Sequence, residues 1–199
     1  MRNIFHRRYN FSSRNFILTA LISYFIDCAA QNQISLSSDY PASTNPIDIM
    51  TNIFIVAAKR TPFGSFGGSL KALTATELGV VSTKAAISAA GIDPSTIDAV
   101  YFGNVIQSSS DAAYLARHVG LKCGVPVAAP ALTINRLCGS GFETVIQGAK
   151  SIRLGEARIV VCGGSENMSM APLQVDGNDA RWGVSLGTGL TMRDSLWDG

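Results

Sequence analysis

Residues 131–142 read ALTINRLCGSGF and contain one cysteine, Cys138. The part before the cysteine is apolar and β-branched, which is typical of a short buried strand. In the part after it, apolar residues recur every three or four positions from Phe142 to Ile152, a spacing that gives an α-helix an apolar face. We therefore predict a short strand, a helix from Cys138 to Leu154, and an α/β fold around this junction.

Cys138 is a candidate nucleophile because it falls where the predicted helix begins. The unpaired N–H groups of a helix start carry a partial positive charge of about half a unit, which favours an anion. A thiol at such a position ionises more readily than a free cysteine, whose pKa is about 8.5. Gly139 and Gly141 each cost a helix about 1 kcal/mol relative to alanine. We interpret these glycines as leaving room for a substrate. The alternative is that Cys138 is only a small buried residue, as most isolated cysteines are.

The rest of the folded part alternates predicted strands and helices. Strands are predicted at 52–59, 99–106, 131–135 and 158–162, and helices at 74–90 and 111–122. Thr74 and Glu77 have the spacing of a capping box, and Gly91 follows as a helix stop. The helix after Cys138 is apolar almost all round at 145–149, so we expect it to be buried. Alternation of this kind predicts a mixed sheet covered by helices on both faces.

Composition limits the functions that the chain can have. Of its 199 residues, 47% are hydrophobic and 15% are charged, which suits one well-buried domain plus an extension. The net charge is +2, but without the four arginines that precede Asp27 only 12 basic residues face 14 acidic ones. The folded part therefore has no basic surface suited to nucleic acid. The four cysteines lack C-x-x-C spacing and neighbouring histidines, so we expect neither a metal site nor a disulfide framework.

Several blocks of the sequence resemble the N-terminal half of the thiolase family, and most closely its mitochondrial 3-ketoacyl-CoA type. The blocks are VAAKRTPFG at 56–64, GNVIQ at 103–107, ARHVGL at 116–121, NRLCGSGF at 135–142 and CGGSENMS at 162–169. They occur in the order that the family has. The resemblance implies a thiolase-like fold for 51–170 and the start of a truncated loop domain at 171–199.

The resemblance also implies a reaction. In thiolases the cysteine that matches Cys138 attacks the keto carbon of a 3-ketoacyl-CoA, acetyl-CoA leaves, and a second CoA takes the acyl group from the enzyme. A thiolate nucleophile divides one difficult carbon–carbon cleavage into two easier steps. The chain is thus expected to be an acyl-CoA C-acyltransferase of fatty-acid β-oxidation, with coenzyme A as substrate and no bound cofactor. Glu166, Met168 and Met170 match a segment near the acyl pocket and are candidate substrate-binding residues.

We find no counterpart of three catalytic groups of the family. They are the histidine of a G-H-P motif, the proton-shuttling cysteine of a C-x-G motif and the asparagine of an N-E-A motif. His118 does not match the catalytic histidine, so we expect a structural or interface role for it. General acid–base catalysis typically contributes about 100 to 10,000-fold in rate. We therefore expect the chain that ends at Gly199 to have little turnover by itself.

Two further functions remain open. A truncated isoform or an incomplete gene model would fold without catalysis, or associate with complete thiolase subunits. A condensing ketoacyl synthase shares the fold and has a cysteine at the same helix start. By analogy with the family, we also expect a homo-oligomer, either a dimer or a tetramer.

Residues 1–50 are predicted to be a leader and linker. Their arginines and serines, with no acid before Asp27, resemble a mitochondrial presequence. The 11-residue apolar run 16–26, followed by CAA, is also typical of a secretory signal, and a start at Met50 would give a cytosolic protein. This run is shorter than the roughly 20 residues that cross a bilayer, so we expect no stable membrane insertion. The resemblance favours the mitochondrion.

Overall fold

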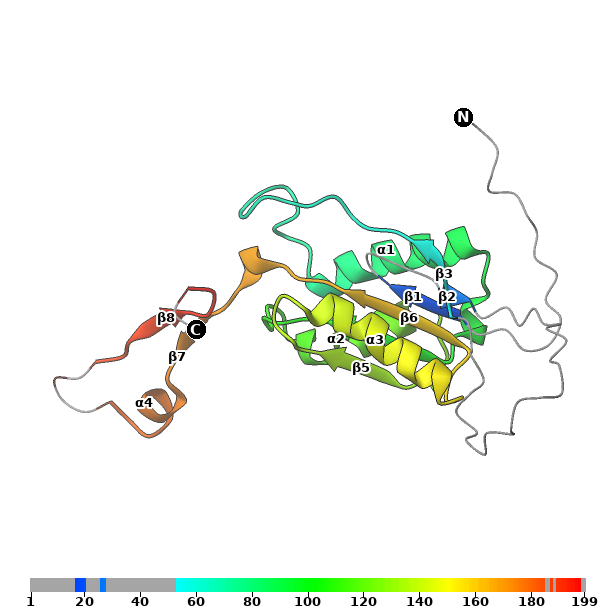
Figure 1. Ribbon diagram of the computed structural model, residues 1–199. Coiled ribbons are helices and arrows are strands. Elements are labelled where there is room, and N and C mark those ends of the chain that lie inside the picture. Colours follow the sequence, from blue (N-terminus) through cyan, green and yellow to red (C-terminus); the bar gives the residue numbers. More distant parts are fainter. Residues whose placement is uncertain (1–16, 21–25, 28–52, 185–186, 188, 198–199) are drawn as a thin grey trace, which may run out of the picture.

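The computed structural model describes residues 17–20, 26–27, 53–184, 187 and 189–197. A six-stranded sheet lies at its centre (Figure 1). In sheet order its strands are β2 (Ile26–Asp27), β3 (Phe54–Ala58), β1 (Ile17–Ala20), β6 (Ile159–Gly164), β4 (Ala99–Gly103) and β5 (Ala131–Ile134). All neighbouring strands are parallel except that β2 is antiparallel to β1 and β3. The predicted mixed sheet is confirmed.

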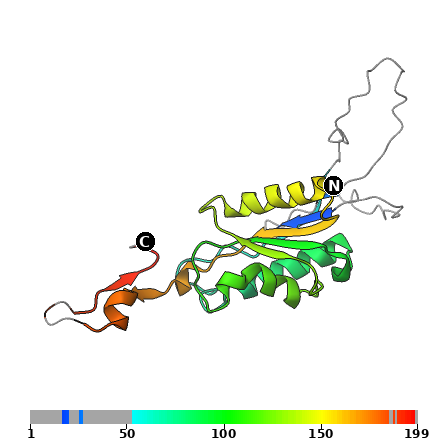
Figure 2. The same cartoon turned by 90° about the horizontal axis from the view of Figure 1, so that it is seen from below.

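Helices cover both faces of this sheet (Figure 2). The helices α1 (Ala75–Ala90) and α2 (Leu115–Lys122) lie together on one face, and α3 (Ser140–Arg153) lies on the other. The larger hydrophobic core fills the space under α1 and α2 and includes Val100, Phe102, Leu115, Val119 and Val161. A smaller core under α3 includes Ala99, Ile152, Val160 and Cys162. The strands β4 and β6 therefore contribute to both cores, as their nearly continuous burial requires.

Two short strands come from the segment that the sequence assigned to a leader. β1 lies between β3 and β6, where its residues Ile17, Leu18 and Thr19 pair with three residues of β6. β2 lies at the edge beside β3. A short apolar run suits a strand as well as a targeting segment, so the pattern alone did not predict this pairing. The rest of the predicted leader and linker lies outside the described residues.

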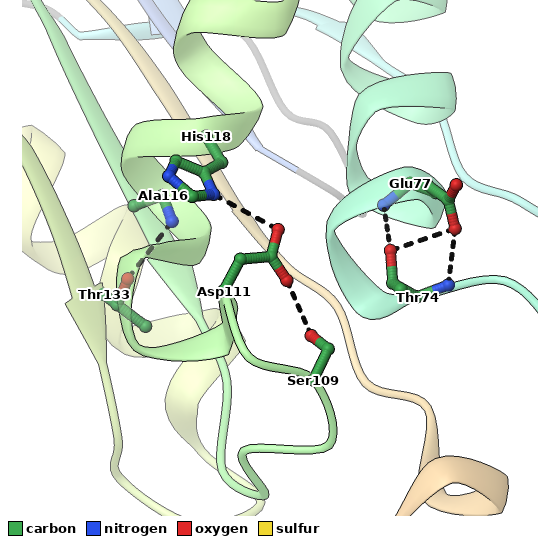
Figure 3. Close-up of polar contacts among 7 residues, drawn as sticks. All are labelled: Thr74, Glu77, Ser109, Asp111, Ala116, His118 and Thr133. Carbon is green, nitrogen blue, oxygen red and sulfur yellow. Dashed lines mark hydrogen bonds and ion pairs between the residues drawn. The ribbon is translucent and has the colours of Figure 1, made fainter.

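Helix α1 begins and ends as predicted. The Thr74 hydroxyl accepts a hydrogen bond from the N–H of Glu77 at 3.1 Å, and the Glu77 carboxylate accepts one from the N–H of Thr74 at 2.7 Å (Figure 3). Gly91 follows the helix with a φ of 66°, a conformation that glycine adopts without strain. The capping box and the glycine stop are confirmed.

Helix α3 differs from its prediction in two respects. It begins at Ser140 and not at Cys138, because residues 136–139 form a separate turn. The expectation that it is buried all round was wrong, since the side chains of Phe142 and Ile146 are 70% and 43% exposed. Its small residues, such as Thr144, face the sheet, and several of its large apolar residues point outward.

The remaining elements are short. They are the 3₁₀ turns η1 (Pro94–Thr96), η2 (Ala112–Tyr114) and η3 (Met168–Met170), the strands β7 (Leu173–Val175) and β8 (Met192–Asp194), and the helix α4 (Gly177–Arg181). β7 and β8 form an antiparallel ribbon that extends away from the six-stranded sheet (Figure 1). None of the helices in the described part of the chain has the length and apolar character needed to cross a bilayer.

Candidate active site

Cys138 lies in a tight turn between β5 and α3, and its side chain is exposed. Leu137, directly before it, has a φ of 49° and is the only residue other than glycine with a positive φ in the described part of the chain. A backbone in this region costs a non-glycine residue about 1–3 kcal/mol. Such strain persists only where surrounding contacts hold it, and it is characteristic of functional sites.

Ser140 and Asn135 provide those contacts. The Ser140 hydroxyl accepts a hydrogen bond from the N–H of Arg136 at 2.8 Å and donates one to the carbonyl of Leu137 at 2.6 Å. The Asn135 side chain accepts a hydrogen bond from the N–H of Leu137 at 3.0 Å. Three hydrogen bonds therefore fix the two residues that precede Cys138.

The start of α3 is open next to this turn. Its N-cap is Gly139, which has no side chain to cap the helix. Cys138 precedes this N-cap, so it lies beside the helix start but not within the first turn. The N–H groups of Gly139 and Ser140 donate to the carbonyls of Arg136 and Leu137. The remaining N–H groups of an uncapped helix start favour an anion close by, so a thiolate on Cys138 is a candidate. The predicted helix start at Cys138 was wrong by two residues, and the effect of the helix start on the Cys138 thiol stays a prediction.

The other described cysteines have the opposite environment. Cys123 and Cys162 are both buried, whereas Cys138 is exposed. Burial raises the pKa of Cys123 to about 11 and raises the pKa of Cys162 well above its usual value. A buried thiol of this kind is inert because its thiolate is destabilised. Cys28 lies outside the described residues.

His118 belongs to a separate polar cluster. Its Nδ1 lies 3.2 Å from Oδ2 of Asp111, and the hydroxyl of Ser109 donates to the other carboxylate oxygen of Asp111 at 2.7 Å (Figure 3). Partial burial raises the pKa of Asp111, but these two hydrogen bonds help to outweigh it, and the pKa falls to about 2. His118 therefore pairs with Asp111, and no hydrogen bond joins it to Cys138 in the described structure.

Glu166 connects the loops that follow β4 and β6. Its carboxylate accepts hydrogen bonds from the N–H of Val105 at 2.9 Å, the N–H of Ile106 at 3.2 Å and the side chain of Asn104 at 3.2 Å. Burial raises the pKa of Glu166, although the three donors oppose this rise. Its oxygens thus hold the loops together, and its predicted substrate-binding role stays a prediction.

Met168 and Met170 lie in η3, which follows the end of β6. The side chain of Met168 is half exposed, and Met170 is partly buried. The structure places both residues in the loop after β6, at the same edge of the sheet as the Cys138 turn, since β6, β4 and β5 are parallel neighbours. Their substrate-binding role stays a prediction.

Asn167 is a structural residue that the sequence analysis missed. Its amide donates hydrogen bonds to the carbonyls of Lys71 at 3.1 Å and Leu73 at 2.6 Å, and its carbonyl accepts one from the N–H of Ser169. The buried Asn167 therefore fastens the loop before α1 to the end of β6. Lys71 and Leu73 lie more than 90 residues away along the chain, so no local pattern could reveal these two contacts.

Comparison with known proteins identifies the family of this arrangement. The family model for the thiolase N-terminal domain matches residues 53–199. The chain belongs to the thiolase family. The resemblance expected from the sequence blocks is thereby confirmed. Human mitochondrial 3-ketoacyl-CoA thiolase is 54% identical over 149 residues, which are 75% of this chain and 37% of that protein.

More distant thiolases and solved thiolase structures support the same family assignment. Acetyl-CoA acetyltransferase of Cupriavidus necator is 43% identical over 151 residues, covering 75% of this chain and 38% of that protein. The crystal structure of human mitochondrial 3-ketoacyl-CoA thiolase in complex with CoA has a TM-score of 0.69 and 56% identity, over 71% of this chain and 36% of the other. Acat5 thiolase from Ascaris suum, in complex with coenzyme A, has a TM-score of 0.66 and 37% identity, over 72% of this chain and 36% of the other. The chain thus spans less than two fifths of each of these relatives.

No group of three or more His, Cys, Asp or Glu residues that could hold a metal ion occurs among the residues that the structure describes. The Cys138 turn itself offers an exposed thiol, a helix start and backbone amides. This combination suits nucleophilic attack on a carbonyl carbon.

Proposed function

We propose that this chain contributes the nucleophile of an acyl-CoA C-acyltransferase that cleaves 3-ketoacyl-CoA by thiolysis. The observation that carries this proposal is the exposed Cys138 on a strained turn beside the uncapped start of α3. Its thiolase relatives include proteins named 3-ketoacyl-CoA thiolase and acetyl-CoA acetyltransferase. Cys138 is the only exposed thiol among the described cysteines, so it is the one that carries the acyl group.

The reaction proceeds in two steps. The Cys138 thiolate attacks the keto carbon, the bond between the α and β carbons breaks, and acetyl-CoA leaves after its α carbon gains a proton. The sulfur of a second CoA, having lost its proton, then attacks the acyl thioester and releases Cys138 and the shortened acyl-CoA. The residues described here supply the nucleophile and the helix start, and we assign no proton-transferring residue among them. We therefore propose that the chain alone forms the acyl-enzyme but turns over slowly.

Mass spectrometry of the acyl-enzyme tests this proposal. The purified chain, incubated with acetyl-CoA, is digested and its cysteine peptides are analysed. We expect acetylation of Cys138, no acetylation of Cys123 or Cys162, and no adduct in the Cys138→Ser variant. An unmodified Cys138 would refute its assignment as the nucleophile. Multiple turnover of acetoacetyl-CoA at the rate of a complete thiolase would instead refute slow turnover.

A second proposal concerns association with other subunits. β5 pairs with β4 alone in the described structure, so one of its edges is free. Exposed apolar side chains surround that edge, namely Leu132, Leu137, Phe142 and Ile146. A free strand edge beside exposed apolar residues is suited to pairing with another chain. We propose that this face forms a homo-oligomer or joins complete thiolase subunits.

Light scattering after gel filtration tests the association. We expect the chain to be a dimer or larger, and we expect Leu132→Lys to shift it towards the monomer because a charge on an edge strand opposes pairing. Leu173→Lys, on the remote strand β7, is the control because its side chain is similarly exposed. A monomeric wild-type chain would contradict this proposal without bearing on Cys138.

We propose a mitochondrial location, supported by the identity with mitochondrial 3-ketoacyl-CoA thiolases and by the arginine-rich, acid-free start of the sequence. Residues 1–50, fused to a fluorescent reporter, are expected to direct it to mitochondria. Secretory staining would favour the apolar run 16–26 as a signal sequence. Diffuse staining would favour a cytosolic product that starts at Met50.

A further inference from the structure

Two glycines lie under the start of α3. Gly103 and Gly164 are the last residues of β4 and β6, and they are partners in the parallel register of these strands. Neither has a positive φ, so their backbone conformation does not require glycine. What glycine contributes at these two positions is therefore the absence of a side chain.

The space above Gly103 is filled by the first turn of α3. A Cβ atom on Gly103 would lie 2.8 Å from the Cβ of Ser140, 2.9 Å from the carbonyl carbon of Ser140 and 3.1 Å from the backbone nitrogen of Gly141. Contacts shorter than 3.0 Å essentially never occur, and two of these atoms belong to backbone that cannot rotate away. A Cβ on Gly164 would lie 3.3 Å from the carbonyl oxygen of Gly103 and at an ordinary contact distance of 3.7 Å from the Cα of Gly141, so it would act on the start of α3 mainly through Gly103.

Ser140 links this contact to the nucleophile. Its hydroxyl holds both Arg136 and Leu137, and Leu137 is the strained residue directly before Cys138. A shift of Ser140 away from the sheet would therefore move the Cys138 turn. On the basis of the proposed function, we propose that Gly103 and Gly164 are positioning residues that seat the start of α3 and thereby fix Cys138 for acyl transfer.

The neighbouring residues make the two strand ends rigid. Asn104 and Ser165 directly follow the two glycines, and the Asn104 amide donates to the carbonyl of Ser165 at 2.9 Å. The N–H of Ser165 donates in turn to the carbonyl of Gly103 at 3.0 Å. The Glu166 carboxylate then binds the loop after β4 through three donors. These hydrogen bonds restrain the backbone around the two glycines, so it cannot easily shift to accommodate an added methyl group.

Alkylation of Cys138 in the full chain tests the positioning role. The rate constant with iodoacetamide is measured across pH by peptide mass spectrometry, and the melting temperature is measured in parallel. We expect Gly103→Ala to slow alkylation of Cys138 by about two- to fivefold at mildly acidic pH, because a sulfur moved away from the start of α3 loses the stabilisation of its thiolate by the helix dipole. Gly164→Ala should have a smaller effect in the same direction, and it keeps the test decisive if Gly103→Ala does not fold.

Gly79→Ala is the matched control. A Cβ on Gly79 would lie 2.9 Å from Cγ2 of Val119 and 3.2 Å from Cε1 of Phe102, in the core on the other side of the sheet. We expect this variant to melt earlier and to keep the wild-type alkylation rate. Equal rates in wild type, Gly103→Ala and Gly164→Ala would overturn the positioning role. Failure of wild type to form the acyl-enzyme would overturn the proposed function while leaving these alkylation rates as a separate result.

Discussion

The starts of α1 and α3 differ in a way that separates structure from function. At α1, the side chains of Thr74 and Glu77 each accept a hydrogen bond from the other residue's backbone N–H. At α3, the N-cap is Gly139 and no side chain caps the helix. An uncapped helix start costs stability, yet it leaves polarised N–H groups free to attract an anion. Under the proposed function, the cap of α1 serves the stability of the fold, whereas the open start of α3 serves the thiolate of Cys138.

The packing of α3 should contribute more to stability than any cap at its start. Ile152 of α3 is 1% exposed and packs against the sheet in the smaller core, which also contains Val160 and Cys162 of β6. We expect Ile152→Ala to lower the free energy of unfolding by about 2–5 kcal/mol, because it removes buried methyl groups and leaves a cavity. Urea denaturation provides the measurement, with Ile146→Ala as the exposed control on the same helix. Equal losses in the two variants would show that this helix is not held by its buried face.

A charge placed at the open helix start should weaken the nucleophile. We expect Gly139→Asp to slow alkylation of Cys138 near pH 7 by about tenfold, since a neighbouring negative charge disfavours the thiolate. Gly139→Asn is the matched control because its side chain has nearly the same shape without the charge. The two variants should have similar melting temperatures. If Gly139→Asn slows alkylation as much as Gly139→Asp, then the side chain acts by capping the helix start or by crowding, and its charge is not the cause.

Acid should weaken the fold near the start of α2 through Asp111. The pKa of Asp111 is lowered to about 2 in the folded chain, from an ordinary value of 3.8. Because the folded-state pKa is the lower one, the carboxylate stabilises the fold fully above about pH 4 and loses this effect as the pH falls to about 2. We expect Asp111→Asn to lower stability at pH 7 by about 1–2 kcal/mol and to flatten the decline between pH 4 and 2. An unchanged slope of stability against pH would contradict the role of this carboxylate.

Removal of the cap at α1 should have the smallest effect. Thr74→Ala takes away the hydroxyl that accepts from the N–H of Glu77, and we expect a loss of about 1 kcal/mol in the free energy of unfolding. Thr74→Ser keeps the hydroxyl and should preserve most of the stability. Neither substitution should change the alkylation rate of Cys138. A changed rate would mean that the start of α1 influences the Cys138 turn, and it would contradict our view that the two helix starts act independently.

Local patterns were sufficient to predict much of the fold. The capping box of α1 and the helix stop at Gly91 depend on residues close in sequence, and both were found where expected. The start of α3 was misplaced by two residues because the Ser140 side chain, and not helix periodicity, determines the turn before it. The pairing of β1 with β6 was also missed, since a four-residue apolar strand has no distinctive sequence pattern.

The candidate site was predicted only in part. Cys138 was recognisable from its glycine neighbours and from its resemblance to a family cysteine. The long-range contacts of Glu166 and Asn167 were not recognisable, because those partners lie 60 to 96 residues away in the sequence. The crowding above Gly103 likewise becomes visible only when β4 and α3 are packed together. Long-range contacts of this kind therefore escape the local sequence patterns that point to Cys138 as the candidate nucleophile.

The most direct test compares the alkylation of the three described cysteines in the folded chain and in urea. We predict that iodoacetamide modifies Cys138 faster in the folded chain than in urea at mildly acidic pH. Cys123 and Cys162 should react only in urea, because both are buried when the chain is folded. A Cys138 that reacts no faster in the folded chain than in the unfolded one would contradict the claim that its turn and the start of α3 activate it.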